Sequence, residues 1–210
     1  MSTAELPFMI KICGITNKRD ARVAIEAGAN ALGFNFYRKS PRFITPVQAR
    51  QIADAVQGEF LRVGVFVNTS EQELLDVAEQ VQLDALQLHG DDCAIPVSAH
   101  YLIWRSIYPN ALPREPDPRI AAYLVDTPTP AFGGSGTTFD WTLAMGSSCR
   151  IILAGGLHAR NVRMAVETVH PWGVDACSRL ESEPGEKDPQ RVREFIRAAR
   201  EASRELAKVL

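Results

Sequence analysis

Residues 8–16 read Phe-Met-Ile-Lys-Ile-Cys-Gly-Ile-Thr, and this stretch decides the fold that we predict for the 210-residue chain. Its first half is an apolar run typical of a buried strand, and the amphipathic segment 17–28 that follows predicts a helix. A cysteine therefore stands where the strand ends, and a glycine opens the turn. Barrels and open sheets built from strand–helix units place their chemistry at this end of the strand.

The same unit recurs along the whole chain. We predict strands near residues 8–13, 31–36, 60–67, 83–88, 101–106, 121–126, 149–154 and 172–176. Helices are expected near residues 17–28, 46–57, 71–80, 139–144, 159–168 and 189–208, with a weak turn near 91–97. The strands are continuous apolar runs, as in parallel strands covered by helices. Eight such units predict one (β/α)8 TIM barrel domain over residues 1–210.

One connection of the predicted barrel lacks the pattern of a helix. The stretch from Tyr108 to Ile120 follows the fifth strand and contains four prolines, Pro109, Pro113, Pro116 and Pro118. Proline inside a helix removes a hydrogen bond and clashes with the preceding turn. We therefore expect the fifth helix to be short or absent.

Composition and charge exclude several classes of function. The chain has 23 Lys and Arg against 25 Asp and Glu, a net charge of −2, which indicates no nucleic-acid partner and no anionic-membrane patch. No apolar run approaches the roughly 20 residues of a membrane span, and the amino end lacks the basic segment of a secretory signal. The four cysteines form no Cys-x-x-Cys pair. We expect free thiols and a cytoplasmic protein.

Polar and small residues follow the predicted strands, at the end where a barrel gathers its chemistry. In chain order they are Cys13 and Gly14, the segment 37–42 with Arg42, Asn68, His89 to Asp92, Arg105 and Ser106, Asp126, Gly155 and Gly156, and Asp175 with Ser178. Because the carboxyl ends of all strands meet at one mouth, we expect these groups to converge there.

Two glycine-rich segments are candidates for ligand contact. Gly155 and Gly156 after the seventh strand, with Ser178 after the eighth, suit a phosphate, because glycines let backbone N–H groups approach an anion. A plain tight turn is the alternative. The segment 133–136, Gly-Gly-Ser-Gly, follows Asp126 and could be a lid that excludes water or a flexible connector.

Cys13 and Asp126 are the candidate acid–base pair. A thiolate can take a proton from carbon while a protonated carboxyl gives one to oxygen, and each role contributes roughly 10²–10⁴-fold in rate. The alternatives are a buried packing thiol for Cys13 and a helix cap or ion-pair partner for Asp126. His89 is either a third titrating group or a hydrogen-bond anchor. The histidines show no ligand spacing, so we predict no metal.

Seven blocks of sequence together resemble the phosphoribosylanthranilate isomerase family of tryptophan biosynthesis. They are Lys-Ile-Cys-Gly-Ile-Thr (11–16), Gly-Phe-Asn-Phe-Tyr with Lys-Ser-Pro-Arg (33–42), Val-Gly-Val-Phe-Val-Asn (63–68), Leu-Gln-Leu-His-Gly (86–90), Val-Asp-Thr (125–127), Gly-Gly-Ser-Gly-Thr-Thr-Phe-Asp-Trp (133–141) and Ala-Gly-Gly-Leu (154–157).

The resemblance implies a (β/α)8 barrel that carries out an Amadori rearrangement of a small phosphorylated substrate without cofactor or metal. By resemblance, Asp126 is the general acid that opens the furanose ring to a Schiff base, and Cys13 is the general base that removes the C2′ proton. The implied substrate-binding residues are Arg42 for the anthranilate carboxylate, Gly155, Gly156 and Ser178 for the phosphate, Asp175 near the sugar hydroxyls, and His89.

The chain departs from the family pattern after the eighth strand. Residues 174–181 read Val-Asp-Ala-Cys-Ser-Arg-Leu-Glu, where the family often reads Val-Asp-Val-Ser-Ser-Gly-Val-Glu. Cys177 replaces a serine, and Arg179 replaces a glycine beside the expected phosphate. If that glycine needs a positive φ, arginine is strained there. If not, the charge of Arg179 joins the phosphate site or points outward.

Two other readings stay open from the residues alone. One is a different phosphate-binding barrel enzyme, such as a sugar-phosphate epimerase, an aldolase or an indole-forming synthase. An aldolase would need a Schiff-base lysine, for which Lys11 is the only candidate within a strand. The other reading is a non-enzymatic barrel that binds a ligand without turnover. The sequence leaves open whether the chain is a monomer or a homodimer.

Overall fold

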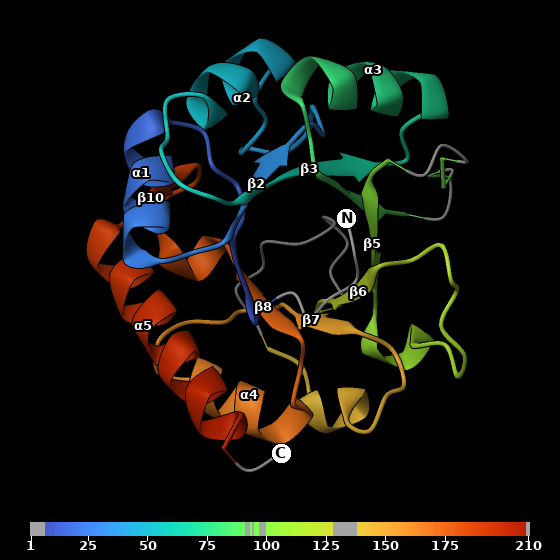
Figure 1. Cartoon of the computed structure of the whole chain (residues 1–210), viewed down its shortest axis with the longest axis vertical. Helices are drawn as coiled ribbons and strands as arrows, with labels where there is room; N and C mark the ends of the chain where they lie inside the picture. Colours follow the sequence, from blue (N-terminus) through green and yellow to red (C-terminus); the bar gives the residue numbers. More distant parts are fainter. Residues whose placement is uncertain (1–6, 91–92, 94, 97–99, 128–137, 209–210) are drawn as a thin grey trace.

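The computed structural model describes residues 7–90, 93, 95–96, 100–127 and 138–208, and its eight parallel strands close into a barrel. The strands are β1 (Met9–Ile12), β2 (Ala31–Asn35), β3 (Leu61–Val67), β4 (Ala85–His89), β5 (Leu102–Ile107), β6 (Ala122–Val125), β7 (Ile151–Leu153) and β8 (Gly173–Ala176). Each strand pairs with the next, and β8 pairs with β1. The predicted (β/α)8 barrel is confirmed, with the helices outside the ring of strands (Figure 1).

Five α-helices cover the barrel within the described residues. They are α1 (Lys18–Ala27), α2 (Pro46–Ala53), α3 (Glu71–Val81), α4 (Val162–Val169) and α5 (Pro189–Leu206). Four of them begin at a residue whose side chain accepts a backbone N–H of the first turn: Asn17, Thr45, Ser70 and Asp188. These caps satisfy donors that have no partner within a helix, and they fix where each helix begins.

Within the described residues, the connections after β5 and β6 each contain a single 3₁₀ turn in place of an α-helix. Pro109–Ala111 follows β5, so the prediction of a short or absent fifth helix is confirmed. Trp141–Ala144 stands where we predicted a helix over 139–144, and the Asp140 side chain accepts the Thr142 N–H. The predicted turn near 91–97 lies largely outside the described residues, and the glycine-rich segment 133–136 lies wholly outside them.

A short antiparallel hairpin follows β8 and was not predicted from the sequence. It consists of β9 (Glu181–Glu183) and β10 (Glu186–Lys187), and Gly185 in the turn has a φ of 89°. Its strands are short and charged, so they carry no apolar period. The side chains of Glu181 and Lys187 are nevertheless buried: β10 lies beside α1 (Figure 1), where the Lys187 N–H donates to Asp20, and Glu181 accepts from Arg42 and Lys187.

The interior of the barrel changes from apolar at one end to polar at the other. Its apolar end holds Met9, Ala31 and Trp104, and Trp104 meets Trp172 edge-on with ring centroids 6.2 Å apart. Side chains of a strand alternate between its two faces, so Met9, Lys11 and Cys13 of the first unit all point inward. The chemistry of the strand ends therefore stands on a packed apolar floor.

Candidate active site

A buried ion pair between β1 and β8 lies beneath the mouth of the barrel. Lys11 and Asp175 are register partners, and the Lys11 Nζ lies 2.9 Å from Asp175 Oδ1, with both side chains buried. Burial alone would lower the pKa of Lys11, but the attraction of Asp175 outweighs it and raises that pKa above its ordinary value. A Schiff-base lysine needs a lowered pKa, so Lys11 does not fit the aldolase reading.

Two thiols lie one step above this ion pair. Cys13 is two residues beyond Lys11, and Cys177 is two residues beyond Asp175, so both continue the inward face of their strands. The Cys177 thiol donates to Glu181 Oε1 at 3.8 Å, and its sulfur accepts from the Lys187 Nζ at 3.6 Å. The adjacent Cys177 thiol, helped by the ammonium of Lys11, lowers the pKa of Cys13 from 9.0 to about 7, even though burial opposes it.

Asp126 follows β6 directly, and backbone groups of two other residues fix its position. Its N–H donates to the Ile107 carbonyl at 3.1 Å, and its Oδ1 accepts the Thr127 N–H at 2.7 Å. Burial raises the pKa of Asp126 from 3.8 to about 6, and the nearby charge of Asp175 adds to the rise. The two candidate catalytic groups therefore shift in opposite directions, each toward the protonation state that its predicted role needs.

The size of these shifts decides how often the pair is ready to react. The reactive form has a protonated Asp126 and a Cys13 thiolate, and the inactive form has an ionised Asp126 and a Cys13 thiol. With pKa values of about 6 and about 7, the reactive form is roughly one tenth as abundant as the inactive form. With the ordinary pKa values of 3.8 and 9.0, the reactive form would be roughly 10⁵ times less abundant than the inactive form. The site raises its relative abundance about 10⁴-fold.

The glycines after β7 and the turn after β8 line one small cavity. Its lining includes five predicted site residues, Asp126, Gly155, Gly156, Asp175 and Ser178. Gly155 and Gly156 have φ values of 84° and 62°, which side-chain-bearing residues rarely adopt. The structure therefore brings these five groups together, whereas Cys13, Arg42 and His89 are not among the residues that line this cavity.

Arg179 lies in the 3₁₀ turn Ser178–Leu180, next to the same cavity. Arg179 is not among the residues with positive φ, so it does not have the backbone strain that replacing a glycine could have caused. The side chain is exposed, and its charge helps to lower the pKa of His158, after the larger effect of burial. The positive charge of Arg179 is therefore added to the rim of the glycine loops.

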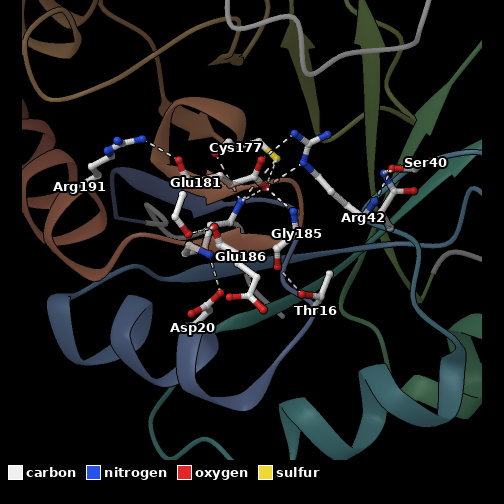
Figure 2. Close-up of polar contacts among 12 residues, drawn as sticks. Thr16, Asp20, Ser40, Arg42, Cys177, Glu181, Gly185, Glu186 and Arg191 are labelled. Atoms are coloured by element: carbon white, nitrogen blue, oxygen red, sulfur yellow. Dashed lines mark hydrogen bonds and ion pairs between the residues drawn. The ribbon is translucent and has the colours of Figure 1, made fainter.

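Arg42 has a partner that the sequence did not reveal. Its Nε and Nη2 donate to Glu181 Oε1 and Oε2 at 2.8 and 2.7 Å, and the buried Lys187 donates to Oε1 at 2.8 Å (Figure 2). Burial would raise the pKa of Glu181, but the bonds from Arg42 and Lys187 lower it. The carboxylate of Glu181, in the hairpin, thus fixes the orientation of the Arg42 guanidinium through two hydrogen bonds. The two residues are 139 positions apart in the chain, so no local sequence pattern indicates that they pair.

His89 is the last residue of β4, and it is buried. Its Nε2 lies 2.7 Å from Gln87 Nε2 and 3.0 Å from Ser106 Oγ. Burial lowers the pKa of His89 to about 3, and the charges of Lys11 and Arg105 add to this effect. His89 is therefore neutral, and of the two readings the hydrogen-bond anchor fits. Ser106 and Arg105 lie within β5, and not after it as we predicted.

The first loop brings the two halves of the site together. A Cβ built on Gly14, whose φ is 70°, would lie 2.6 Å from Arg42 Cδ and 2.9 Å from Cys177 Sγ. Only glycine lets β1 end this close to both side chains. Within the described ranges, no group of three or more His, Cys, Asp or Glu could hold a metal, and no helix is long and apolar enough to cross a membrane.

A comparison with protein families matches residues 10–198 to the model of N-(5′-phosphoribosyl)anthranilate isomerase. The chain belongs to the N-(5′-phosphoribosyl)anthranilate isomerase family. A family member from Solibacter usitatus is 49% identical over 200 residues, which cover 93% of this chain and 98% of that one. The isomerase reaction of tryptophan biosynthesis is accordingly the activity of this chain.

Solved isomerases share the fold over nearly their whole length. Crystallised monomers of the dimeric isomerase from Thermotoga maritima are 36% identical, with a TM-score of 0.77 over 92% of this chain and 98% of that one. An isomerase in complex with reduced 1-(o-carboxyphenylamino)-1-deoxyribulose 5-phosphate is 35% identical, with a TM-score of 0.77 and the same coverage.

The geometry predicts that Gly155→Ala damages the site, whereas Gly146→Ala does not. Both glycines have positive φ, at 84° and 65°, so alanine costs about 1 kcal/mol of backbone strain at either position. A Cβ on Gly155 would lie 2.3 Å from Thr127 Oγ1 and 3.2 Å from Asp126 Oδ1, whereas nothing lies within 4 Å at Gly146.

Urea unfolding should therefore show a loss from backbone strain in both variants and a larger loss for Gly155→Ala, whose Cβ also overlaps Thr127, while steady-state kinetics should separate the two at the site. We expect kcat/KM to fall at least about tenfold for Gly155→Ala only, because a catalytic group misplaced by about 1 Å loses up to 10²-fold. Equal kinetics in the two variants would show that the contact with Asp126 and Thr127 has no part in the site.

Proposed function

We propose that the chain isomerises N-(5′-phosphoribosyl)anthranilate by general acid–base catalysis, with Asp126 as the acid and Cys13 as the base. The observation that carries the proposal is the convergence of Asp126, Gly155, Gly156, Asp175 and Ser178 on one cavity. The opposite pKa shifts, to about 6 for Asp126 and to about 7 for Cys13, support the two roles. Burial favours the neutral carboxyl, whereas a thiol donor and an ammonium favour the thiolate. An ordinary buried thiol would have a raised pKa instead.

The proposed reaction needs one proton given and one proton taken. Asp126 protonates the furanose ring oxygen, the C1′–O bond breaks, and the nitrogen lone pair forms a protonated Schiff base. Cys13 then removes the C2′ proton, and the electrons of that C–H bond neutralise the iminium as an enolamine. Tautomerisation of the enolamine gives the ketone. Each transfer by a placed group contributes roughly 10²–10⁴-fold in rate.

The two ends of the substrate match the charges around the mouth. We assign the anthranilate carboxylate to Arg42, whose fixed geometry against Glu181 orients its remaining N–H donors. The phosphate is assigned to Gly155, Gly156 and Ser178. The compound in the related crystal structure carries a carboxyl at one end and a phosphate at the other, which supports a site with two anion-binding ends.

Two binding residues complete the proposal. Asp175 accepts from Lys11 with Oδ1 at 2.9 Å, and we assign its carboxylate to the sugar hydroxyls. His89, neutral and tied to Ser106, is assigned to hydrogen bonding at the wall of the site. We further propose that the chain works in the cytoplasm as one barrel, without a cofactor, as a monomer or a homodimer.

Removing either proposed proton carrier tests the assignment. Cys13→Ala and Asp126→Asn should each lower kcat by about 10²–10⁴-fold, because each substitution removes one proton transfer. The loss of phosphoribosylanthranilate fluorescence measures turnover, and circular dichroism confirms that the fold survives. Cys149→Ala is the matched control, since this buried thiol contacts the Pro113 carbonyl at 3.6 Å, away from the mouth. Near-normal turnover by either site variant would refute its role.

The pH profile of kcat/KM should be a bell between the two pKa values, about 6 and about 7. The competent form holds one proton between the two groups. Below this window the pair gains a second proton, and above it the pair loses its only one, so the rate falls roughly tenfold per pH unit on either side. A rate that stays constant from about pH 5 to pH 9 would contradict the assignment.

Variants of Cys177 identify the thiol in this profile. Cys177→Ala removes the donor to the thiolate and raises the pKa of Cys13. Each unit of rise should lower the maximum about tenfold and move the alkaline limb upward, since that limb marks loss of the proton that rests mainly on Cys13. Cys177→Ser keeps a hydroxyl donor, so we expect a smaller change. An unmoved alkaline limb in Cys177→Ala would refute the assignment.

A further inference from the structure

We propose that Cys13 and Cys177 form a redox pair, which a peroxide converts into an intramolecular disulfide that reversibly removes the catalytic base. The proposal rests on the role of Cys13 stated above. It concerns Cys177, which has no part in the proposed proton transfers. Four observations carry it: register, contact, neighbouring charge and exposure.

The strand register places the two cysteines opposite each other. β1 pairs with β8 at Lys11↔Asp175 and Ile12↔Ala176, and the Cys13 N–H donates to the Ala176 carbonyl at 3.0 Å. Paired strands lie about 4.8 Å apart, and disulfides span Cα separations of about 4.4–6.8 Å. The two residues lie just past the strand ends.

The two side chains are neighbours at the end of the β1–β8 seam. A Cβ built on Gly14, which follows Cys13 directly, would lie 2.9 Å from Cys177 Sγ, and Cys177 has the largest influence on the pKa of Cys13. Both cysteines are only partly buried, at the open end of the barrel. The other two thiols are buried: Cys93 accepts the Thr69 N–H at 3.4 Å, and Cys149 contacts the Pro113 carbonyl. A small oxidant therefore reaches the pair first.

The oxidation of the two thiols by hydrogen peroxide is balanced, and water is its only by-product. The Cys13 thiolate attacks hydrogen peroxide, the O–O bond breaks, and Cys13 becomes a sulfenic acid while hydroxide leaves. The Cys177 thiolate then attacks the sulfenic sulfur and displaces a second hydroxide, which forms the S–S bond. The two thiol protons neutralise the two hydroxides. Two electrons pass from the sulfurs to the peroxide, and a dithiol returns them by exchange.

Charges around Cys177 favour the second step only after the first has occurred. The hydrogen bond to Cys13 and burial hold the pKa of Cys177 well above 9.0, and the negative charge of Cys13 adds to this. Oxidation to a neutral sulfenic acid abolishes both contributions of Cys13. The Lys187 Nζ, 3.6 Å from Cys177 Sγ, and the nearby Arg42 then favour the thiolate, against the carboxylate of Glu181, whose Oε1 accepts from this thiol at 3.8 Å. Cys177 is thereby set up to resolve the oxidised Cys13.

The test is a peptide map under non-reducing conditions after treatment of the full chain with hydrogen peroxide. Trypsin should release residues 12–18 linked to residues 164–179, at the summed mass minus two hydrogens. Activity should fall in proportion to the linked fraction, so that half conversion halves the rate, and dithiothreitol should restore both. The peptides that carry Cys93 and Cys149 should stay unlinked and serve as internal controls.

Cys177→Ser supplies the matched variant, with its own untreated activity as the reference. Without a resolving thiol, excess peroxide should drive Cys13 to the sulfinic acid, and dithiothreitol should fail to restore the lost activity. Recovery of the variant equal to that of the parent would overturn the proposal. So would a parent chain in which Cys13 reaches the sulfinic acid while Cys177 stays a free thiol. A linked chain with full activity would instead refute the role of Cys13 as base.

Discussion

The buried pair of Lys11 and Asp175 supports everything above it. It joins the first strand to the last across the seam that closes the barrel, its atoms lie 2.9 Å apart, and the side chains of Lys11 and Asp175 are 0% and 9% exposed. Removing one partner of such a pair leaves an unpaired buried charge, which costs about 3–5 kcal/mol. The pair also acts on both candidate catalytic groups, because its charges contribute to the pKa of Cys13 and to that of Asp126.

The surroundings of Asp126 and Cys13 shift both groups away from their ordinary protonation states, which would not suit an acid and a base. Burial makes Asp126 a weaker acid, while a thiol donor and an ammonium make Cys13 a stronger one. The same closeness of Cys177 that favours the thiolate also creates a partner for its oxidation. Tuning of the base and its sensitivity to oxidants are therefore coupled in this chain.

Local patterns were enough to predict the barrel, the weak fifth helix, and the meeting of Asp126, Gly155, Gly156, Asp175 and Ser178 at one cavity. Parallel strands deliver their carboxyl ends to one mouth whatever the loops contain. The pairings across the mouth were missed, because they depend on how the ring closes. Lys11 reads as a lone strand lysine until β8 lies beside it. Glu181 and Lys187 read as surface charges, since a short hairpin leaves no periodic signal.

Direct titration of the Cys13 thiol tests the central claim that the site makes this cysteine a base. The thiolate absorbs in the ultraviolet, and the difference between the parent chain and Cys13→Ala isolates its signal. We predict a transition with a midpoint at about 7, where Cys177 and Lys11 stabilise the charge. A midpoint at or above the ordinary value of 9.0 would contradict the account, because Cys13 would then be a buried thiol and not a base.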